Sequence, residues 1–325
     1  MFKINQSGIL QWQRCYGGSN GDFARAIYPT TDGGYVIAGY TGSFDGDVTG
    51  YLGVSDAWVV KITNTGAIQW QKCLGSYGAD EAEFIEQTSD GGFLMVGNTN
   101  SIEGDVIGNH GGSRDSWVVK LNNLGAIQWQ RCLGGSGIDY GFSLTQTSDG
   151  GAIILNCTTS SDGDVSGYSG GGAYDAWLVK LNNLGNIEWQ ECIGGSNTDF
   201  IYNTKPTIDN GYILAGSTSS VNGDVSGNQG GSDAWVVKLT SFLGLEEPSI
   251  INRVSLYPNP VTNVLYLIVG SNIENSTYIL TDLKGKIIRQ GIIDKNVTSI
   301  NVEYLSKGVY FIKIAGNEVI KFIKE

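Results

Sequence analysis

Four close copies of one segment fill about three-quarters of the chain, and this repetition constrains the fold more than any other feature. The segment WVVKLNNLGAIQWQRCLGG begins at Trp117 and recurs in variants that begin at Trp58, Trp177 and, in shortened form, Met1. The repeat is 58 to 60 residues long, as measured between its Trp-Gln dipeptides at Trp12, Trp70, Trp129 and Trp189. A period of this size indicates one supersecondary unit that occurs in tandem, each copy burying its apolar face against the next.

The second copy shows what one unit contains. Residues 58–62 and 68–73 have strand patterns, residues 84–88 lead into a Ser-Asp-Gly-Gly turn, and residues 93–96 follow that turn. A turn of this kind between two such runs indicates a β-hairpin, and none of the four runs has helical spacing. We therefore expect the four strands to form one antiparallel meander, which is the form of a blade in a β-propeller. A right-handed β-solenoid is the second interpretation, since its coils would be shorter and more regular.

The repeat predicts an all-β chain with two domains. Residues 1–240 are expected to form a β-propeller of four four-stranded blades of about 59 residues each, alone or as part of a larger ring. The expected units are residues 1–57, 58–116, 117–176 and 177–234, with a closing strand at 235–240. Residues 1–4 align with 59–62 and compete with that closing strand for one place, so the sequence leaves the number of blades open. The same alignment leads us to expect a signal peptide upstream of this chain.

Composition excludes some classes of function. The formal net charge is −12, but residues 249–325 carry nine Lys and Arg against six Asp and Glu, which leaves the rest of the chain at −15. An acidic repeat region repels phosphate backbones, so nucleic acid is not an expected partner. No run of 18 apolar residues is present, so we expect no transmembrane helix. The single histidine, His110, argues against Ser or Cys hydrolase chemistry; it is interpreted as a solvated loop residue or, second, as a ligand contact.

Several fixed landmarks of the repeat resemble the SBBP family of bacterial β-propeller repeats. They are Asp115-Ser116-Trp117-Val118-Val119-Lys120-Leu121, Leu133-Gly134-Gly135, Asp139-Tyr140 and Asp149-Gly150, each with counterparts in the other copies. The resemblance covers residues 1–239 and implies a propeller, but no single activity follows from it, because propellers host many functions. The chain departs from the family in its Trp-Gln-x-Cys strand and in an added Gly-Asp-Val loop.

Only one loop of the repeat varies in length. From the Asp of Gly-Asp-Val to the Asp before the next Trp strand, the spacing is 9, 10, 11 and 9 residues, whereas the other landmarks keep their spacing. Variable length marks a solvent-exposed loop, so this variable loop is the expected binding surface. Its acidic side chains have the spacing of oxygen ligands and suggest calcium; the alternative is that they cap turns as Asx motifs. The candidate sets are Asp45, Asp47 and Asp56; Glu103, Asp105 and Asp115; Asp162, Asp164 and Asp175; and Asn222, Asp224 and Asp233.

Other recurrent residues divide into candidate ligand contacts and architecture. The rings at the strand starts are expected to be exposed beside the acidic loop and to form a carbohydrate platform: Trp58, Trp117, Trp177 and Trp235. The rings of the next strand are expected to pack between blades: Trp12, Trp70, Trp129 and Trp189. An acid ten residues after each of these is interpreted as bonding strand backbone, because a catalytic group is normally unique: Asp22, Asp80, Asp139 and Asp199. The recurrent cysteines Cys15, Cys73, Cys132 and Cys192 are interpreted as small buried groups, with a Cys132–Cys157 disulfide as the less favoured alternative.

The repeat motifs end before a linker at residues 241–250, and a different sequence pattern follows it. Residues 251–325 contain about seven short strand runs, which predicts a small β-sandwich of the immunoglobulin type. The region strongly resembles the carboxy-terminal sorting domain of type IX secretion substrates (the Por secretion tail). The motifs that carry this resemblance are Tyr257-Pro258-Asn259-Pro260, Asp282-Leu283-Lys284-Gly285-Lys286, Leu305-Ser306-Lys307-Gly308-Val309-Tyr310 and Lys321-Phe322-Ile323-Lys324. The resemblance implies that a translocon in the outer membrane reads the domain and that a sortase removes it and can link the cargo to surface lipopolysaccharide; an ordinary sandwich module is the alternative.

Together these patterns predict a secreted or cell-surface β-propeller that binds an extracellular glycan or protein and is not an enzyme. The alternative is an extracellular carbohydrate-active enzyme, a glycan hydrolase or lyase that uses acids at the centre of the ring. A third interpretation is a structural adhesin in which the propeller only spaces other domains. Glycan binding without turnover would favour the first function, and release of product would favour the second.

Overall fold

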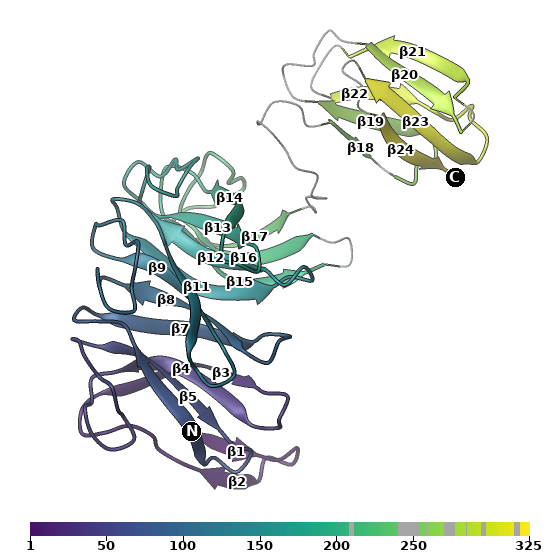
Figure 1. Cartoon of the computed structure of the whole chain (residues 1–325). Helices are drawn as coiled ribbons and strands as arrows, with labels where there is room; N and C mark the ends of the chain where they lie inside the picture. Colours follow the sequence, from purple (N-terminus) through teal and green to yellow (C-terminus); the bar gives the residue numbers. More distant parts are fainter. Residues whose placement is uncertain are drawn as a thin grey trace. The chain divides into compact units, whose positions relative to one another are not determined.

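A computed structural model describes residues 1–207, 211–239, 254–257, 259–269, 277–283, 285–293, 297–314 and 319–325. These residues form strands and loops, so the prediction of an all-β chain is confirmed (Figure 1). None of them belongs to a helix of the length and hydropathy that a membrane span requires. The chain divides into two compact units, Met1–Phe242 and Leu243–Glu325. The expected linker at residues 241–250 and Asp209, the counterpart of Asp149 in the fourth repeat, lie outside the described residues.

The amino-terminal unit is a series of antiparallel sheets that follow one another along the chain. Sheet 1 consists of β3 (Asp22–Pro29), β4 (Tyr35–Thr41), β5 (Asp56–Ile62) and β6 (Ile68–Leu74). Sheet 2 consists of β7 (Asp80–Gln87), β8 (Phe93–Thr99), β9 (Asp115–Leu121) and β10 (Ile127–Leu133). Sheet 3 consists of β11 (Asp139–Gln146), β12 (Ala152–Thr158), β13 (Asp175–Leu181) and β14 (Ile187–Ile193). Sheet 4 has three described strands, β15 (Asp199–Pro206), β16 (Tyr212–Thr218) and β17 (Asp233–Leu239), and an amino-terminal hairpin of β1 (Phe2–Ile4) and β2 (Leu10–Gln13) precedes sheet 1.

The predicted meander of residues 58–96 does not form. β5 and β6 pair within sheet 1, whereas β7 and β8 pair within sheet 2, and the change of sheet falls between Leu74 and Asp80. A unit that is cut at residue 58, 117 or 177 therefore combines halves of two neighbouring sheets. The reason is that a tandem repeat reveals the length of its unit but not the point at which one sheet ends and the next begins.

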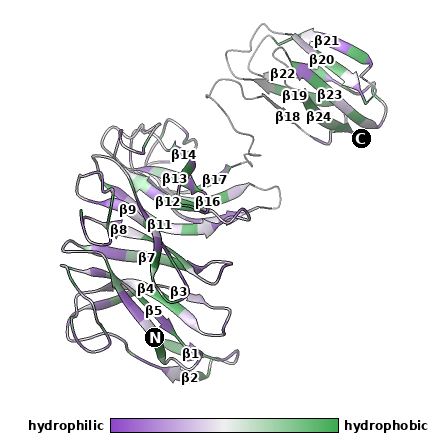
Figure 2. Cartoon of the chain, viewed as in Figure 1, coloured by the Kyte–Doolittle hydropathy of each residue, from purple (hydrophilic) through white to green (hydrophobic). Residues whose placement is uncertain are grey.

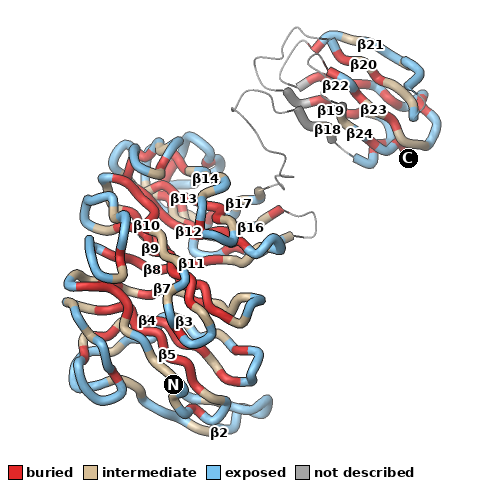
Figure 3. Tube along the Cα trace, viewed as in Figure 1, coloured by how far each residue is buried: buried red, intermediate tan, exposed pale blue. Residues whose placement is uncertain are grey.

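Neighbouring sheets pack face to face, and each internal sheet is covered on both faces. On β5, Val59 lies in a core with Ile85 and Met95 of sheet 2, whereas Val60 lies in a separate core on the other face. Because both faces are covered, β5, β9 and β13 are buried along their whole length (Figure 3), although each combines apolar residues with a buried Asp and a buried Lys (Figure 2). The first strands of successive sheets also contact one another, β3 with β7, β7 with β11 and β11 with β15. The first strands therefore share one side of the unit, which we call the first-strand side.

Each first strand begins with a carboxylate that joins three segments. In sheet 3, Asp139 accepts hydrogen bonds from the hydroxyl of Thr158, from Ser160 Oγ (2.7 Å) and from the Gly135 amide (2.9 Å). The equivalent Asp80 of sheet 2 accepts from Thr99, Ser101 and the Ser76 amide. Both carboxylates are fully buried, and burial raises the pKa of each because the charged form has lost its water. The prediction that these recurrent acids bond the backbone is confirmed, and the two hydroxyl partners are an additional finding.

The five cysteines are all free thiols. Cys132 and Cys157 are buried, whereas Cys15 beside the amino-terminal hairpin is exposed. Burial raises the pKa of Cys132 to about 12, because an apolar environment disfavours the thiolate. Cys132 and Cys157 therefore serve as small apolar groups, and the alternative disulfide between them does not form. The prediction that the recurrent cysteines are buried is wrong for Cys15, which is exposed, and holds only in part for Cys73 and Cys192, which are half-buried.

The carboxy-terminal unit contains seven described strands in two sheets. One sheet has the order β18 (Val254–Tyr257), β19 (Val264–Val269) and β22 (Val297–Asn301). The other has the order β21 (Ile287–Ile292), β20 (Thr277–Asp282), β23 (Gly308–Ile314) and β24 (Val319–Lys324). Side chains from both sheets, among them Leu267, Leu280 and Ile312, form one core, so the two sheets pack as a sandwich, as the sequence predicts.

Removal of the buried carboxylate of sheet 3 tests its role in the fold. The Asp139→Ala variant leaves two hydroxyls and the Gly135 amide without their acceptor, so we expect the free energy of unfolding to fall by about 3 kcal/mol. Urea unfolding of the full chain, followed by tryptophan fluorescence, measures the change. Glu103→Ala, at an exposed position of a variable loop, is the control and should stay within about 0.5 kcal/mol of the parent. An Asp139→Ala variant as stable as this control would contradict the role.

Candidate functional site

The variable loops hold their acidic side chains apart from one another. In sheet 1, backbone amides donate to Asp45 (2.7 Å) and Asp47 (3.2 Å) from the turn before β3, and to Asp56 (2.8 and 3.0 Å) from the loop itself. Backbone amides likewise cap the corresponding residues Asp105, Asp115, Asp162, Asp175, Asn222, Asp224 and Asp233. Asp164 instead pairs with Arg131 at 3.1 Å, and Glu103 is exposed. Within the described ranges no three His, Cys, Asp or Glu side chains converge on one metal position, so the predicted calcium sets are not brought together. The acids cap backbone amides, but those amides belong to distant segments or to residues that precede the acid, so the contacts are not the Asx turns of the alternative interpretation.

The Trp residues at the strand starts are buried, and the expectation that they form an exposed platform is wrong. Their exposed fractions are 6%, 0%, 0% and 9% for Trp58, Trp117, Trp177 and Trp235. In sheets 1 to 3 the ring N–H donates to a Gln side chain of the fourth strand at 2.7 to 2.8 Å, and we call this contact the Trp–Gln bridge: Trp58 to Gln71, Trp117 to Gln130 and Trp177 to Gln190. The expectation fails because each ring faces the core between its own sheet and the preceding sheet or hairpin.

The other tryptophan series behaves as predicted. Trp12, Trp70, Trp129 and Trp189 are half-buried, and each packs against a core between neighbouring sheets. The amide of Gln130 next to Trp129 also donates to the Ile107 carbonyl (3.0 Å), which ties the fourth strand to the variable loop. The fourth strand therefore stabilises the loop as well as the sheet.

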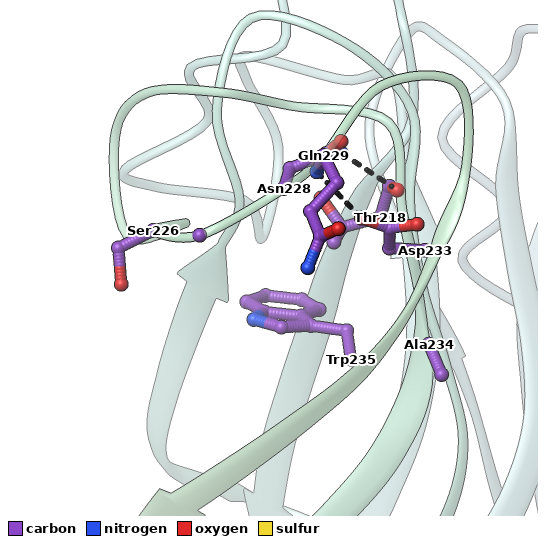
Figure 4. Close-up of a pocket in the computed structure, with 8 residues that line it drawn as sticks. Thr218, Ser226, Asn228, Gln229, Asp233, Ala234 and Trp235 are labelled. Carbon is purple, nitrogen blue, oxygen red and sulfur yellow. Dashed lines mark hydrogen bonds between the residues drawn. The ribbon is translucent and has the colours of Figure 1, made fainter.

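Sheet 4 has a hollow where the other sheets have the Trp–Gln bridge. A cavity of about 360 Å³ is lined by Thr218, Ser226, Gly227, Asn228, Gln229, Asp233, Ala234 and Trp235 (Figure 4). The Gln229 amide donates to Asp233 (2.7 Å) and the Asn228 side chain to the Thr218 carbonyl (3.2 Å), so the variable loop lies over the Trp235 ring. Among the strands that the structure describes, none follows β17 in this sheet, so no Gln reaches Trp235 from a fourth strand.

His110 connects two variable loops. Its Nδ1 lies 2.8 Å from Asp115 Oδ2 in its own loop, and its Nε2 lies 3.6 Å from Asp164 Oδ2 in the loop of sheet 3. On the far side, Arg131 Nη2 lies 3.1 Å from Asp164 Oδ1. The histidine side chain is 28% exposed, so His110 joins neighbouring loops and offers a ligand only a small part of its ring.

A continuous group of aromatic and charged side chains lies on the first-strand side. Its members are the second and fourth residues of each first strand, namely Phe23 and Arg25, Glu81 and Glu83, Tyr140 and Phe142, and Phe200 and Tyr202. Arg114 and Tyr174, which directly precede β9 and β13, join the same group. We call these ten residues the first-strand surface.

Sheets 3 and 4 supply the aromatic part of the first-strand surface. The Phe142 ring meets Phe200 and Tyr202 edge to face, with centroids 6.2 and 6.1 Å apart. Tyr174 lies 5.5 Å from Phe200 and 6.1 Å from Tyr140. Rings in contact of this kind hold one another in place, and Tyr202 is 52% exposed, so the cluster offers rigid aromatic area to solvent.

Sheets 1 and 2 supply the ionic part. The Arg114 guanidinium donates to both carboxylate oxygens of Glu81 at 3.0 and 3.2 Å and lies 5.9 Å from the centroid of Tyr140. Arg25 Nε lies 3.6 Å from Glu83 Oε2. Burial raises the pKa of the Glu83 carboxyl, and the positive charge of Arg25 opposes that rise. The bidentate pair fixes hydrogen-bonding groups in orientation directly beside an aromatic face.

Sequence reasoning missed the first-strand surface, although a signal for it exists. The first residue of each first strand is always Asp, whereas the second and fourth read Phe and Arg, Glu and Glu, Tyr and Phe, or Phe and Tyr. Positions that differ between copies of an otherwise regular repeat are free of the packing constraint. The prediction of the variable loop as the binding surface followed from loop length alone.

The predicted sorting residues mostly hold the carboxy-terminal sandwich together. Asn259 accepts a hydrogen bond from the Ile323 amide (2.9 Å) and donates to the Lys321 carbonyl (3.2 Å), which joins the first motif to β24. The Lys286 amide donates to Asp282 (2.9 Å) across a turn in which Gly285 has a φ of 79°. Such a left-handed backbone conformation favours glycine.

The remaining sorting residues divide between core and surface. Leu305 and Tyr310 are buried, and the Tyr310 hydroxyl donates to the Ser306 carbonyl at 2.8 Å. Gly308 begins β23 and Lys324 is buried, whereas Pro260 and Lys321 are exposed. Pro258 and the side chain of Tyr257 lie outside the described residues.

The fold and the sites define an all-β repeat protein with a separate carboxy-terminal sandwich. Residues 255–325 match the family model of the secretion system C-terminal sorting domain, so this part of the predicted resemblance is confirmed. The sorting domain supports secretion through the type IX system, implies an interaction with that machinery and indicates an extracellular or cell-surface protein.

Solved structures resemble the chain only distantly, and no curated protein matches it. PorZ, an essential bacterial surface component of the type-IX secretion system of Porphyromonas gingivalis, is 12% identical with a TM-score of 0.36 over 100% of this chain and 42% of its own. A Synechocystis apocarotenoid oxygenase mutant is 11% identical (TM-score 0.38; 93% of this chain, 70% of that one). A Bombyx mori β-fructofuranosidase is 12% identical (TM-score 0.34; 95% and 74%). Scores this low carry no argument about activity, and the chain spans less than half of PorZ.

The buried acids of the loops predict a dependence of stability on pH. Burial raises the pKa of Asp56 to about 6, so the folded chain binds more protons than the unfolded chain between about pH 4 and pH 6. Stability from this group is therefore greatest below pH 4 and falls as the pH rises toward 6. The Asp56→Asn variant removes this dependence, so its stability relative to the parent should rise by about 2 to 3 kcal/mol from pH 4 to pH 7. Urea midpoints at several pH values measure the difference, and a parent-like slope in the variant would contradict the assignment.

Proposed function

We propose that the amino-terminal unit is an extracellular ligand-binding β-propeller whose sheets are the blades. Four-stranded antiparallel sheets that pack face to face, with their first strands together, support this reading. The described sheets then form an open arc of blades, as in part of a larger ring, made of SBBP-type repeats. The sorting domain carries this unit out of the cell.

The first-strand surface is the proposed ligand site, and its aromatic cluster is the observation that carries the proposal. In a propeller the first strands face the central axis, where side chains of several blades converge on one ligand. The rings of Phe142, Phe200 and Tyr202 can stack on the apolar faces of a sugar, and the adjacent Glu81–Arg114 pair can bond its hydroxyl groups. We therefore assign an extracellular glycan as the ligand class, with a protein ligand as the alternative.

Binding is favoured over hydrolysis by the state of the acids on this surface. A glycosidase needs two carboxyl groups on either side of the scissile bond, one of them protonated. Glu81 is engaged in a bidentate ion pair with Arg114, and Arg25 lies beside Glu83 and opposes the rise in the pKa of its carboxyl that burial causes. The enzyme alternative therefore requires acids that these arginines do not occupy.

Truncation of the aromatic cluster tests the binding site. A glycan array probed with the full chain identifies a ligand, and titration calorimetry then compares variants with the parent. Tyr202→Ala and Phe142→Ala should each weaken binding about tenfold or more, because the ring contacts of the ligand are lost. Phe44→Ala removes a more exposed ring (69% against 52% for Tyr202) from a variable loop and should leave affinity unchanged.

The reverse result would indicate that the ligand binds at the variable loops. If Phe44→Ala weakens binding and the two cluster variants do not, the first-strand surface is not the ligand site. Release of reducing sugar from the bound glycan would support the enzyme alternative instead.

Exchange of the sorting domain tests the route of export. Replacement of residues 249–325 by an unrelated tag should leave the amino-terminal unit inside the cell envelope of a host with a type IX system, because the translocon no longer has its signal. Fusion of residues 249–325 to an unrelated periplasmic protein should send that protein to the surface or medium. Immunoblots of cell fractions measure both results, and normal export of the tagged chain would refute the assignment.

A further inference from the structure

Sheet 4 exposes to solvent a face that every preceding sheet buries. Val236 of β17 is 66% exposed and Ile213 of β16 is 38% exposed. Their equivalents Val118 and Ile153 are fully buried because the following sheet covers them. The exposed face of sheet 4 therefore has the residues that elsewhere in this molecule receive another sheet of the same kind.

Among the described strands, none pairs with the edge of β17 at which equivalent strands have a partner. β5, β9 and β13 each pair with a fourth strand, whereas β17 pairs only with β16 among the described strands. Trp235 adjoins the cavity of Figure 4, in the place where a fourth-strand Gln completes the Trp–Gln bridge of the other sheets. An unpaired strand edge is a template for the addition of a strand.

The amino-terminal end of the chain carries the matching strand. The sequence Leu10-Gln11-Trp12-Gln13-Arg14-Cys15 is the counterpart of the fourth strands, with Gln13 in the place of Gln130. Gln13 is exposed, whereas Gln130 is bonded to Trp117. On β3, Ile27 is 50% exposed, whereas its equivalents Ile85 and Leu144 are buried. The surface around β2 is thus the complement of the surface around β17.

We propose that β17 of one molecule pairs with β2 of a second copy of this chain. Gln13 of the second copy then completes the Trp–Gln bridge with Trp235, and the exposed face of sheet 4 covers sheet 1 of that copy. β17 takes the place of β1, which pairs with β2 in the register that β9 has with β10. β17 is seven residues long and contains the bridging Trp, whereas β1 has three residues and no Trp.

The second copy is the occupant because one molecule does not bring the two strands together. β2 pairs with β1 and β17 with β16, at opposite ends of the amino-terminal unit (Figure 1). The interface joins two different surfaces, so each molecule offers one of each. Such head-to-tail contacts close into a ring when the rotation between molecules allows it and otherwise extend into a filament.

Light scattering after size-exclusion chromatography of the full chain tests the pairing. The molar mass should rise above that of one chain as concentration increases. Val236→Asp places a charge on a face that is exposed in the single molecule and buried in the pair, so it should weaken association about tenfold or more while the thermal midpoint of the dilute chain stays unchanged. Ile102→Asp is the matched control on a side chain that is 79% exposed in a variable loop, and it should associate as the parent does.

The reactivity of Cys15 gives a second readout that is specific for β2. In the proposed register Cys15 lies opposite Trp235, as Cys132 lies opposite Trp117. Cys132 is buried and Cys15 is exposed in the single molecule, so alkylation of Cys15 should slow several-fold at associating concentrations and not in Val236→Asp. A chain that stays monomeric at all concentrations would overturn the proposal. Association in which Cys15 is alkylated as fast as in the single molecule would also overturn it. So would association that Ile102→Asp weakens as much as Val236→Asp does.

Discussion

Each internal sheet of the amino-terminal unit has a neighbour on both faces, and most of the structure follows from this constraint. A strand such as β9 has no solvent-facing side, so Val118 and Val119 are apolar, and the polar ends of Trp117 and Lys120 are hydrogen-bonded. Asp139 has an amide and two hydroxyls, and Trp117 has Gln130. Lys61 reaches the hairpin acid Asp32 at 2.8 Å, and this hydrogen bond lowers the pKa of Asp32 well below its usual value. The landmarks that recur in every repeat are thus the partners that burial on both faces demands.

The same constraint determines where a ligand site can be placed. Residues that pack between sheets cannot change without loss of stability, whereas the side chains on the first-strand side have no sheet above them. There the four repeats differ, and the differences sort by chemistry, with the ionic residues on sheets 1 and 2 and the rings on sheets 3 and 4. A surface that mixes fixed rings with one bidentate ion pair has the features of a recognition site rather than of a core.

Local features of the fold were predictable from the sequence, and long-range features were not. Strands, hairpins and the sorting sandwich follow from short-range patterns such as the Ser-Asp-Gly-Gly turn before Phe93 and the Asp282–Gly285 turn. The predicted boundaries between sheets were wrong, because the change of sheet between Leu74 and Asp80 depends on which strands pair and not on the length of the repeat. The burial of Trp117 was missed for the same reason: its covering sheet and its partner Gln130 both come from elsewhere in the fold. The loop acids had the spacing of metal ligands, but Asp45, Asp47 and Asp56 already accept hydrogen bonds from the backbone amides of Ser19, Gly17, and Leu52 and Gly53, respectively.

Repetition also explains why apolar side chains are exposed at the two ends of the amino-terminal unit. Val118 and Val236 occupy the same place in the repeat, and only the presence of a following sheet makes one buried and the other exposed. Tandem-repeat proteins usually cover their ends with polar capping units, because an uncapped apolar face is poorly solvated. The amino-terminal hairpin covers sheet 1 in part, through Trp12 Nε1 to the Asn64 carbonyl (3.0 Å) and the Tyr16 hydroxyl to the Gly66 carbonyl (2.8 Å), and it leaves Ile27 half exposed. Sheet 4 has no such cover among the described residues. A repeat that fits its own neighbour inside one chain fits it equally well between chains, so the packing that builds the unit also supplies the means of joining one unit to another.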